Sequence, residues 1–149
     1  MLETKFKTKE EIIEVATEHV HDADTAFSRR RLRLYAFPYD ISIAIGEHAY
    51  CTPRESGHPW EDYEKVELAI FAPCGDSDNM AMLGSSDIYE LFGEDVAQHC
   101  EGWSLVREED DEEFSMFNQN SVMPYISWDD VLQVVNTIKK HTPEAKDQI

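Results

Sequence analysis

The sequence predicts a single α+β domain in which N- and C-terminal helices pack on one face of an antiparallel sheet of four or five strands. Three observations support this class. The chain has 149 residues, which is about the size of one domain. Apolar residues recur at helical spacing near both ends and alternate with polar residues in between. Strand-like segments also follow one another without intervening helices, which favours α+β over α/β architecture.

The first helix is predicted over residues 9–20. Thr8 followed by Glu11 has the capping-box pattern that opens a helix. His19 and His21 would then be cations at the negative C-terminal end of this helix. The apolar residues at helical spacing are Ile12, Ile13, Ala16 and Val20.

Three strands are predicted in the centre of the chain. Residues 31–37 and 41–50 alternate with a period of two and flank a turn at 38–40, so they form an antiparallel pair. Residues 64–72 form the third strand, which ends at Pro73.

The second half of the chain is predicted to contain two helical regions and a hairpin. Ser86 caps a short helix over residues 87–92, which Gly93 breaks, and a second helical turn spans 94–100. Residues 103–108 and 113–117 form a hairpin around Asp110 and Asp111. Ser127 and Asp130 open the last helix, and residues 142–149 are a frayed tail. The apolar stripe of this helix is Val131, Leu132, Val134, Val135 and Ile138.

Acidity is the strongest functional signal. The chain has 31 Asp and Glu against 13 Lys and Arg, which gives a net charge of -18. Such a charge disfavours direct contact with nucleic acid or anionic membranes and favours a basic protein partner. The alternative is that the acidity serves only to keep the protein soluble. Residues 29–33 hold the only dense basic patch, which can bind phosphate or neutralise neighbouring acidic residues.

The composition also predicts a cytoplasmic protein. No signal peptide is visible, and no apolar run is long enough to span a membrane. Three cysteines, Cys51, Cys74 and Cys100, do not form a disulfide framework. The sequence gives no indication of the oligomeric state.

No metal or cofactor site is predicted. His48 and Cys51 have the spacing of half a zinc site, but Cys74 stands alone and His99 is adjacent to Cys100, so no second pair completes it. The sequence contains no P-loop, nucleophile elbow or dinucleotide-binding glycine pattern. The string from His19 to Asp24 would gather metal ligands only in an extended conformation.

An alternative hypothesis is a small enzyme or ligand-binding domain built around Cys51, Arg54 and His58. An arginine or protonated histidine beside a thiol can lower its pKa and make it nucleophilic. A cavity into which these three side chains converge would support this hypothesis. A third hypothesis is an acidic structural or assembly protein.

Two groups of carboxylates are the candidate partner-binding residues. Ordered rows of carboxylates on a folded surface resemble the phosphates of a duplex, so such a protein can occupy the basic groove of a nucleic-acid-binding factor. The first group lies near the third strand and the second at the predicted hairpin tip. They are Glu61, Asp62, Glu64 and Glu67, and Glu108, Glu109, Asp110, Asp111, Glu112 and Glu113.

Three segments resemble those of small, uncharacterised acidic proteins encoded by bacteriophages. These segments are residues 39–43 (YDISI), 66–70 (VELAI) and 125–131 (YISWDDV), of which the last leads into the final helix. The resemblance implies a role in host takeover or in evasion of bacterial defence, where small acidic inhibitors recur. It assigns no functional residues.

Overall fold

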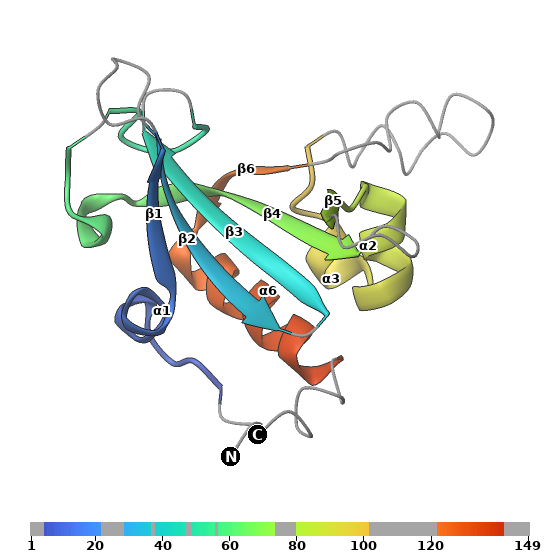
Figure 1. The fold of residues 1–149 in the computed structure, drawn as a ribbon. Helices are drawn as coiled ribbons and strands as arrows, with labels where there is room; N and C mark the ends of the chain where they lie inside the picture. Colours follow the sequence, from blue (N-terminus) through green and yellow to red (C-terminus); the bar gives the residue numbers. More distant parts are fainter. Residues whose placement is uncertain are drawn as a thin grey trace.

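A computed structural model describes residues 5–21, 29–36, 38–46, 49–55, 57–73, 80–101 and 122–141. These residues form a six-stranded antiparallel sheet with helices, so the predicted α+β class is confirmed, with one or two strands more than expected (Figure 1). The elements are α1 (Lys9–Val15), β1 (Thr17–His21), β2 (Arg29–Ala36), β3 (Tyr39–Gly46), the 3₁₀ helix η1 (Trp60–Asp62), β4 (Lys65–Pro73), β5 (Met80–Met82), α2 (Ser85–Phe92), α3 (Glu94–Ala97), β6 (Met123–Ser127) and α6 (Trp128–Lys140).

The sheet is a meander that branches at β4. Strands β1 to β4 pair in sequence order, and both β5 and β6 pair with β4. Strand β6 pairs with the beginning of β4 and β5 with its end. Leu32 lies opposite Ile43, which in turn lies opposite Leu68. Because side chains alternate along a strand, these residues share the face that builds the core.

Helix α6 covers this face, and Figure 1 shows it running behind the strands. The Ser127 hydroxyl accepts a hydrogen bond from the Asp130 backbone N–H at 3.2 Å, so the predicted cap is confirmed. The buried side chains of the helix are Trp128, Val131, Val134, Val135 and Ile138. Each large apolar side chain buried in this way contributes about 1.5–3 kcal/mol.

The first helix begins as predicted. The Thr8 hydroxyl accepts a hydrogen bond from the Glu11 N–H, and the Glu11 carboxylate accepts one from the Lys7 N–H at 2.6 Å. The chain before α1 is joined to α6, because Phe6 and Asn136 exchange two hydrogen bonds of 2.9 Å. Both terminal helices therefore lie on the same side of the sheet.

The predicted extent of the first helix, residues 9–20, is wrong. Helix α1 ends at Val15, Ala16 is extended with ψ 154°, and β1 follows directly. Strand pairing explains the change, since Thr17 lies opposite Arg33 and His21 opposite Arg29. The backbone hydrogen bonds between these strands override the helical propensity of residues 17–20. His19 and His21 are therefore strand residues, and the prediction that they end a helix is also wrong.

The remaining predictions were accurate to within a few residues where the structure describes the chain. The three central strands are shifted by up to four residues at their ends, and Tyr39 and Asp40 belong to β3 and not to the turn. Helix α2 starts after Gly84 and not at a Ser86 cap. Strands β5 and β6 were not predicted. The predicted hairpin at 103–117 and the tail at 142–149 lie outside the described residues.

None of the helices in the described part of the chain has the length and apolar character needed to cross a membrane.

Candidate functional site

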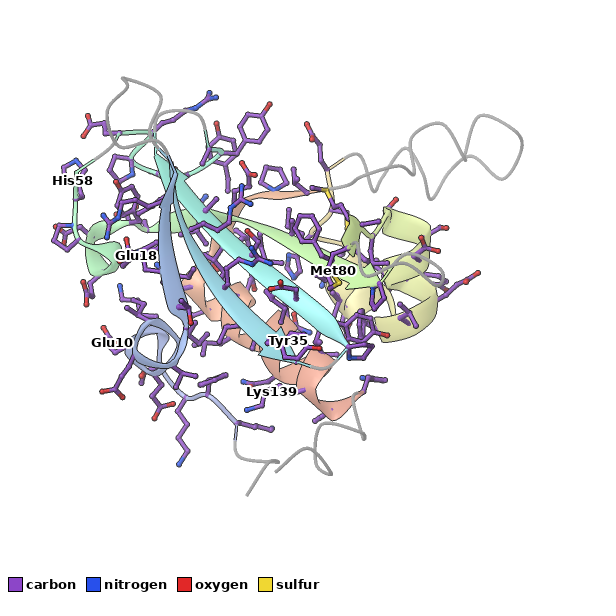
Figure 2. The ribbon with its side chains drawn as sticks, in the orientation of Figure 1. Glu10, Glu18, Tyr35, His58, Met80 and Lys139 are labelled. Atoms are coloured by element: carbon purple, nitrogen blue, oxygen red, sulfur yellow. The ribbon has the colours of Figure 1, made fainter. Side chains whose placement is uncertain are left out.

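The exposed carboxylates of the described residues fall mainly on two separate surfaces. Figure 2 shows Glu10 and Glu18 on one side of the molecule, and α2 and α3 lie on the opposite side. We call the first surface the β1-side edge; it consists of Glu10, Glu14, Glu18, Glu55, Glu61, Asp62 and Glu64. We call the second the α2–α3 face; it consists of Asp87, Glu90, Glu94, Asp95 and Glu101.

The β1-side edge contains three of the predicted partner-binding residues. Trp60 is buried and anchors η1, whose first turn carries the exposed Glu61 and Asp62. Glu64 is exposed just before β4. The short helix and the buried indole therefore leave Glu61 and Asp62 exposed, and Glu64 is exposed one residue after Tyr63.

Cations are interspersed among the carboxylates of the β1-side edge. The Glu18 carboxylate accepts a hydrogen bond from Arg30 Nε at 2.6 Å, and His58 Nε2 lies 2.7 Å from the Glu55 carboxylate. The Lys9 ammonium donates to the backbone carbonyl of Glu61 at 2.9 Å, which ties α1 to η1. Two of the seven carboxylates of this edge, those of Glu18 and Glu55, are therefore engaged by cations of the protein itself.

Arg30 joins three parts of the β1-side edge. Besides pairing with Glu18, its Nη1 donates to the His58 carbonyl at 2.7 Å, and its guanidinium carbon lies 5.2 Å from the centre of the Trp60 ring. The hydrogen bond from Arg30 lowers the pKa of Glu18 below its ordinary value. Part of the basic patch at 29–33 thus neutralises acidic residues, which is one of the roles the sequence allowed.

Glu67 does not join the other predicted carboxylates. It lies opposite Ala44 on the sheet face away from α6, because its neighbours Val66 and Leu68 point into the core. Its carboxylate Oε1 accepts a hydrogen bond from the Tyr50 N–H at 2.9 Å. The first predicted group is therefore divided between two surfaces.

The α2–α3 face is shaped by a break at Gly93. This residue ends α2 and precedes α3 with φ 92°, a left-handed conformation that glycine adopts without strain. The break lets Ile88 and Phe92 of α2, and Val96 of α3, all point inward. The Glu101 N–H then donates to the Val122 carbonyl at 2.8 Å, which fixes the end of this region beside β6.

The carboxylates of the α2–α3 face point outward and lack basic neighbours in the sequence. Residues 80–101 include five Asp and Glu and no Lys or Arg. Within α2, Asp87 and Glu90 are three residues apart, which places them on the same side of the helix. Within the described ranges, the carboxylates of Asp87, Glu90, Asp95 and Glu101 form no ion pair.

Sequence reasoning did not single out the α2–α3 face. A count of charge in a sliding window would have found it, because residues 80–113 carry eleven acidic residues and only one basic residue, Arg107. The second predicted group, Glu108 to Glu113, belongs to this segment but lies outside the described residues.

The structure places Cys51, Arg54 and His58, the residues of the alternative site, in three different surroundings. The Cys51 thiol is 1% exposed and donates to the carbonyls of Gly46 and Pro53. Burial raises the pKa of this thiol, so it is protonated at neutral pH and is a poor nucleophile. The Arg54 guanidinium lies over the Tyr50 ring, and the His58 imidazole contacts the Glu55 carboxylate.

No cluster of three or more His, Cys, Asp or Glu side chains suited to a metal ion occurs in the described part of the chain. Cys100 is buried, and burial raises the pKa of its thiol to about 12. His48 and Cys74 lie outside the described residues.

Comparison with protein-family models, with curated protein sequences and with solved structures found no match.

Proposed function

We propose that this protein is a non-enzymatic binding protein that presents an acidic surface to a basic surface of another protein. The observation that carries the proposal is the α2–α3 face, where five carboxylates are exposed in a segment without any Lys or Arg. Four of them, Asp87, Glu90, Asp95 and Glu101, form no ion pair within the described residues and can therefore pair with a partner, whereas Glu18 and Glu55 of the β1-side edge are engaged by Arg30 and His58.

In the proposed mechanism, the acidic surface binds the basic surface of the partner electrostatically and blocks it sterically. Lysine and arginine side chains of the partner pair with the carboxylates of the α2–α3 face and with the adjoining run from Glu108 to Glu113. The negative field of the whole chain, with its net charge of -18, accelerates encounter with a basic surface. The exposed Tyr89 and Leu91 lie among the carboxylates of α2 and add apolar contact area.

In its narrower form, the proposal is that the partner handles nucleic acid. The acidic surface then occupies the groove that normally accepts phosphates, as a nucleic-acid mimic. The resemblance of residues 39–43, 66–70 and 125–131 to phage-encoded proteins supports an inhibitor of a host nucleic-acid-handling or defence factor.

The test compares variants that lose four charges each. The face-neutral variant carries Asp87→Asn, Glu90→Gln, Asp95→Asn and Glu101→Gln. The run-neutral variant carries Glu108→Gln, Glu109→Gln, Asp110→Asn and Asp111→Asn. The edge-neutral control carries Glu10→Gln, Glu14→Gln, Glu61→Gln and Asp62→Asn. Partners are captured from a bacterial lysate at low and high salt, and the affinity of each captured protein is measured.

We expect the face-neutral and run-neutral variants to bind about 10- to 100-fold more weakly, since each lost ion pair costs about 0.2–1 kcal/mol. The edge-neutral control should lose less than about 3-fold, and binding of all forms should weaken as salt rises. Displacement of the captured protein by a DNA duplex would support the nucleic-acid mimic. An affinity that changes neither with salt nor with any of the three sets of substitutions contradicts the proposal.

A further inference from the structure

Two tyrosines, Tyr50 and Tyr125, form an exposed pair. One precedes the α2–α3 segment in the sequence and the other follows it. Tyr50 follows β3 and Tyr125 lies in β6, and the Tyr125 N–H donates to the Tyr50 carbonyl at 3.0 Å. Their ring centroids are 5.7 Å apart with an interplanar angle of 36°. The residues are 37% and 43% exposed, so the rings are available on the surface instead of completing the core.

Tyr125 has an unfavourable backbone conformation. Its φ is 52°, which places a residue with a bulky side chain in the left-handed region that glycine and asparagine adopt more readily. Residues held in such conformations occur often at binding sites, where the fold accepts strain to direct a side chain. Here the conformation directs an exposed aromatic ring toward Tyr50.

A carboxylate is held against the backbone of Tyr50. Glu67 is half-buried, and its Oε1 accepts the Tyr50 N–H at 2.9 Å, which fixes the orientation of the side chain. The second oxygen, Oε2, makes no hydrogen bond to any residue that the structure describes. A carboxylate fixed at the backbone of an exposed tyrosine suits a partner group that both stacks on the ring and donates hydrogen bonds.

The guanidinium of Arg54 shows which chemical group these rings accept. Its carbon lies 5.1 Å from the centre of the Tyr50 ring, within the range of a cation–π interaction. An arginine of the chain itself thus stacks on one ring of the pair. Guanidinium is planar, weakly hydrated and able to donate to a carboxylate while it stacks, whereas the lysine ammonium is a strongly hydrated point charge.

We propose that Tyr50, Tyr125 and Glu67 form a recognition site for an arginine side chain of the basic partner. The guanidinium stacks on Tyr125 and donates to Glu67 Oε2. The inference rests on the proposed function, and it adds that the protein recognises an arginine side chain of the partner as well as its net charge.

The test uses two labelled peptides of equal length and charge, hexa-arginine and hexa-lysine, and fluorescence anisotropy. We expect the full chain to bind hexa-arginine more tightly, and Tyr125→Asn to lower the ratio of the two affinities by about 3- to 5-fold. Tyr125→Phe keeps the ring and should keep the ratio. Glu67→Gln should lower it, because the amide oxygen still accepts the Tyr50 N–H but carries no charge.

Asparagine is chosen because it tolerates the left-handed conformation, so the melting temperature of Tyr125→Asn should be unchanged or higher. The face-neutral variant should weaken both peptides equally and leave the ratio unchanged. A ratio that Tyr125→Asn and Glu67→Gln do not alter overturns the arginine site and leaves the proposed function standing. Failure of the full chain to bind either peptide overturns both.

Discussion

The β1-side edge and the α2–α3 face are both acidic, but the protein uses their charge differently. At the edge, Arg30 pairs with Glu18 and also contacts η1 through the His58 carbonyl and the Trp60 ring. On the α2–α3 face, Asp87 and Glu90 have no ion-pair partner within the described residues. Exposed carboxylates therefore serve the fold where a cation lies within reach, as Glu18 does, whereas Asp87 and Glu90 stay outside the ion pairs of the described residues.

The two surfaces also differ in how the chain supplies their charges. The cations of the β1-side edge come from segments far apart in sequence, since Arg30 belongs to β2 and Lys9 to α1. The α2–α3 face is one continuous segment that excludes Lys and Arg altogether. Removing a cation of the edge should therefore affect folding, and neutralising the face should affect binding.

The largest stability effect is expected from Arg30→Ala. This substitution removes an ion pair with the exposed Glu18, a hydrogen bond to the His58 carbonyl and a cation–π contact with the buried Trp60 ring, so the free energy of unfolding should fall by about 2 kcal/mol. Urea unfolding monitored by tryptophan fluorescence measures it. The matched control, Lys140→Ala, removes an exposed charge at the end of α6 and should cost less than about 0.5 kcal/mol. Equal effects of the two substitutions would remove the distinction between the surfaces.

The face-neutral variant should have a smaller effect on stability. Of the substituted residues, Asp87 and Asp95 lie in the first turns of α2 and α3, where negative charge is favourable, but repulsion among the carboxylates of the face is unfavourable. These opposing contributions should limit the change in the free energy of unfolding to less than about 1 kcal/mol. Calorimetry of the variant and the original chain tests this. A loss greater than that of Arg30→Ala would mean that the face is structural.

The sequence predicted those elements whose signals are local. The start of α6 was predicted because Ser127, Asp130 and the apolar stripe lie within one segment. The end of α1 was not, because residues 17–21 continue the helical pattern and become a strand only by pairing with residues 29–33. Strands β5 and β6 are short, and they form only because they pair with β4, which lies far from β6 in the sequence.

The candidate site was predictable in part for the same reason. The acidity of the α2–α3 face is local and could have been counted from the sequence. The engagement of Glu18 by Arg30 could not, because it depends on the pairing of β1 with β2. The orientation of Tyr125 toward Tyr50 likewise depends on a backbone conformation that no sequence pattern indicates.

The smallest expected effect is the pH dependence that Glu18 contributes. Because Arg30 lowers the pKa of Glu18 in the folded state, the ionised carboxylate stabilises the fold above its unfolded pKa, and this contribution is lost as the pH falls through the folded value. Glu18→Gln should therefore cost a few tenths of a kcal/mol at neutral pH, since the pair is partly exposed to solvent. The cost should shrink as the pH falls below the unfolded pKa of about 4.3 and vanish once the pH is below the lower pKa of the folded state.

Urea unfolding of the original chain and of Glu18→Gln, at neutral and acidic pH, measures this difference. The same substitution in the Arg30→Ala background is the matched control, because it removes the cause of the shift and should abolish the pH dependence. If the difference between the two chains instead grew as the pH fell, the Glu18 carboxylate would be stabilised in its protonated form. The β1-side edge would then resemble a site that holds excess negative charge, and the contrast with the α2–α3 face would be reversed.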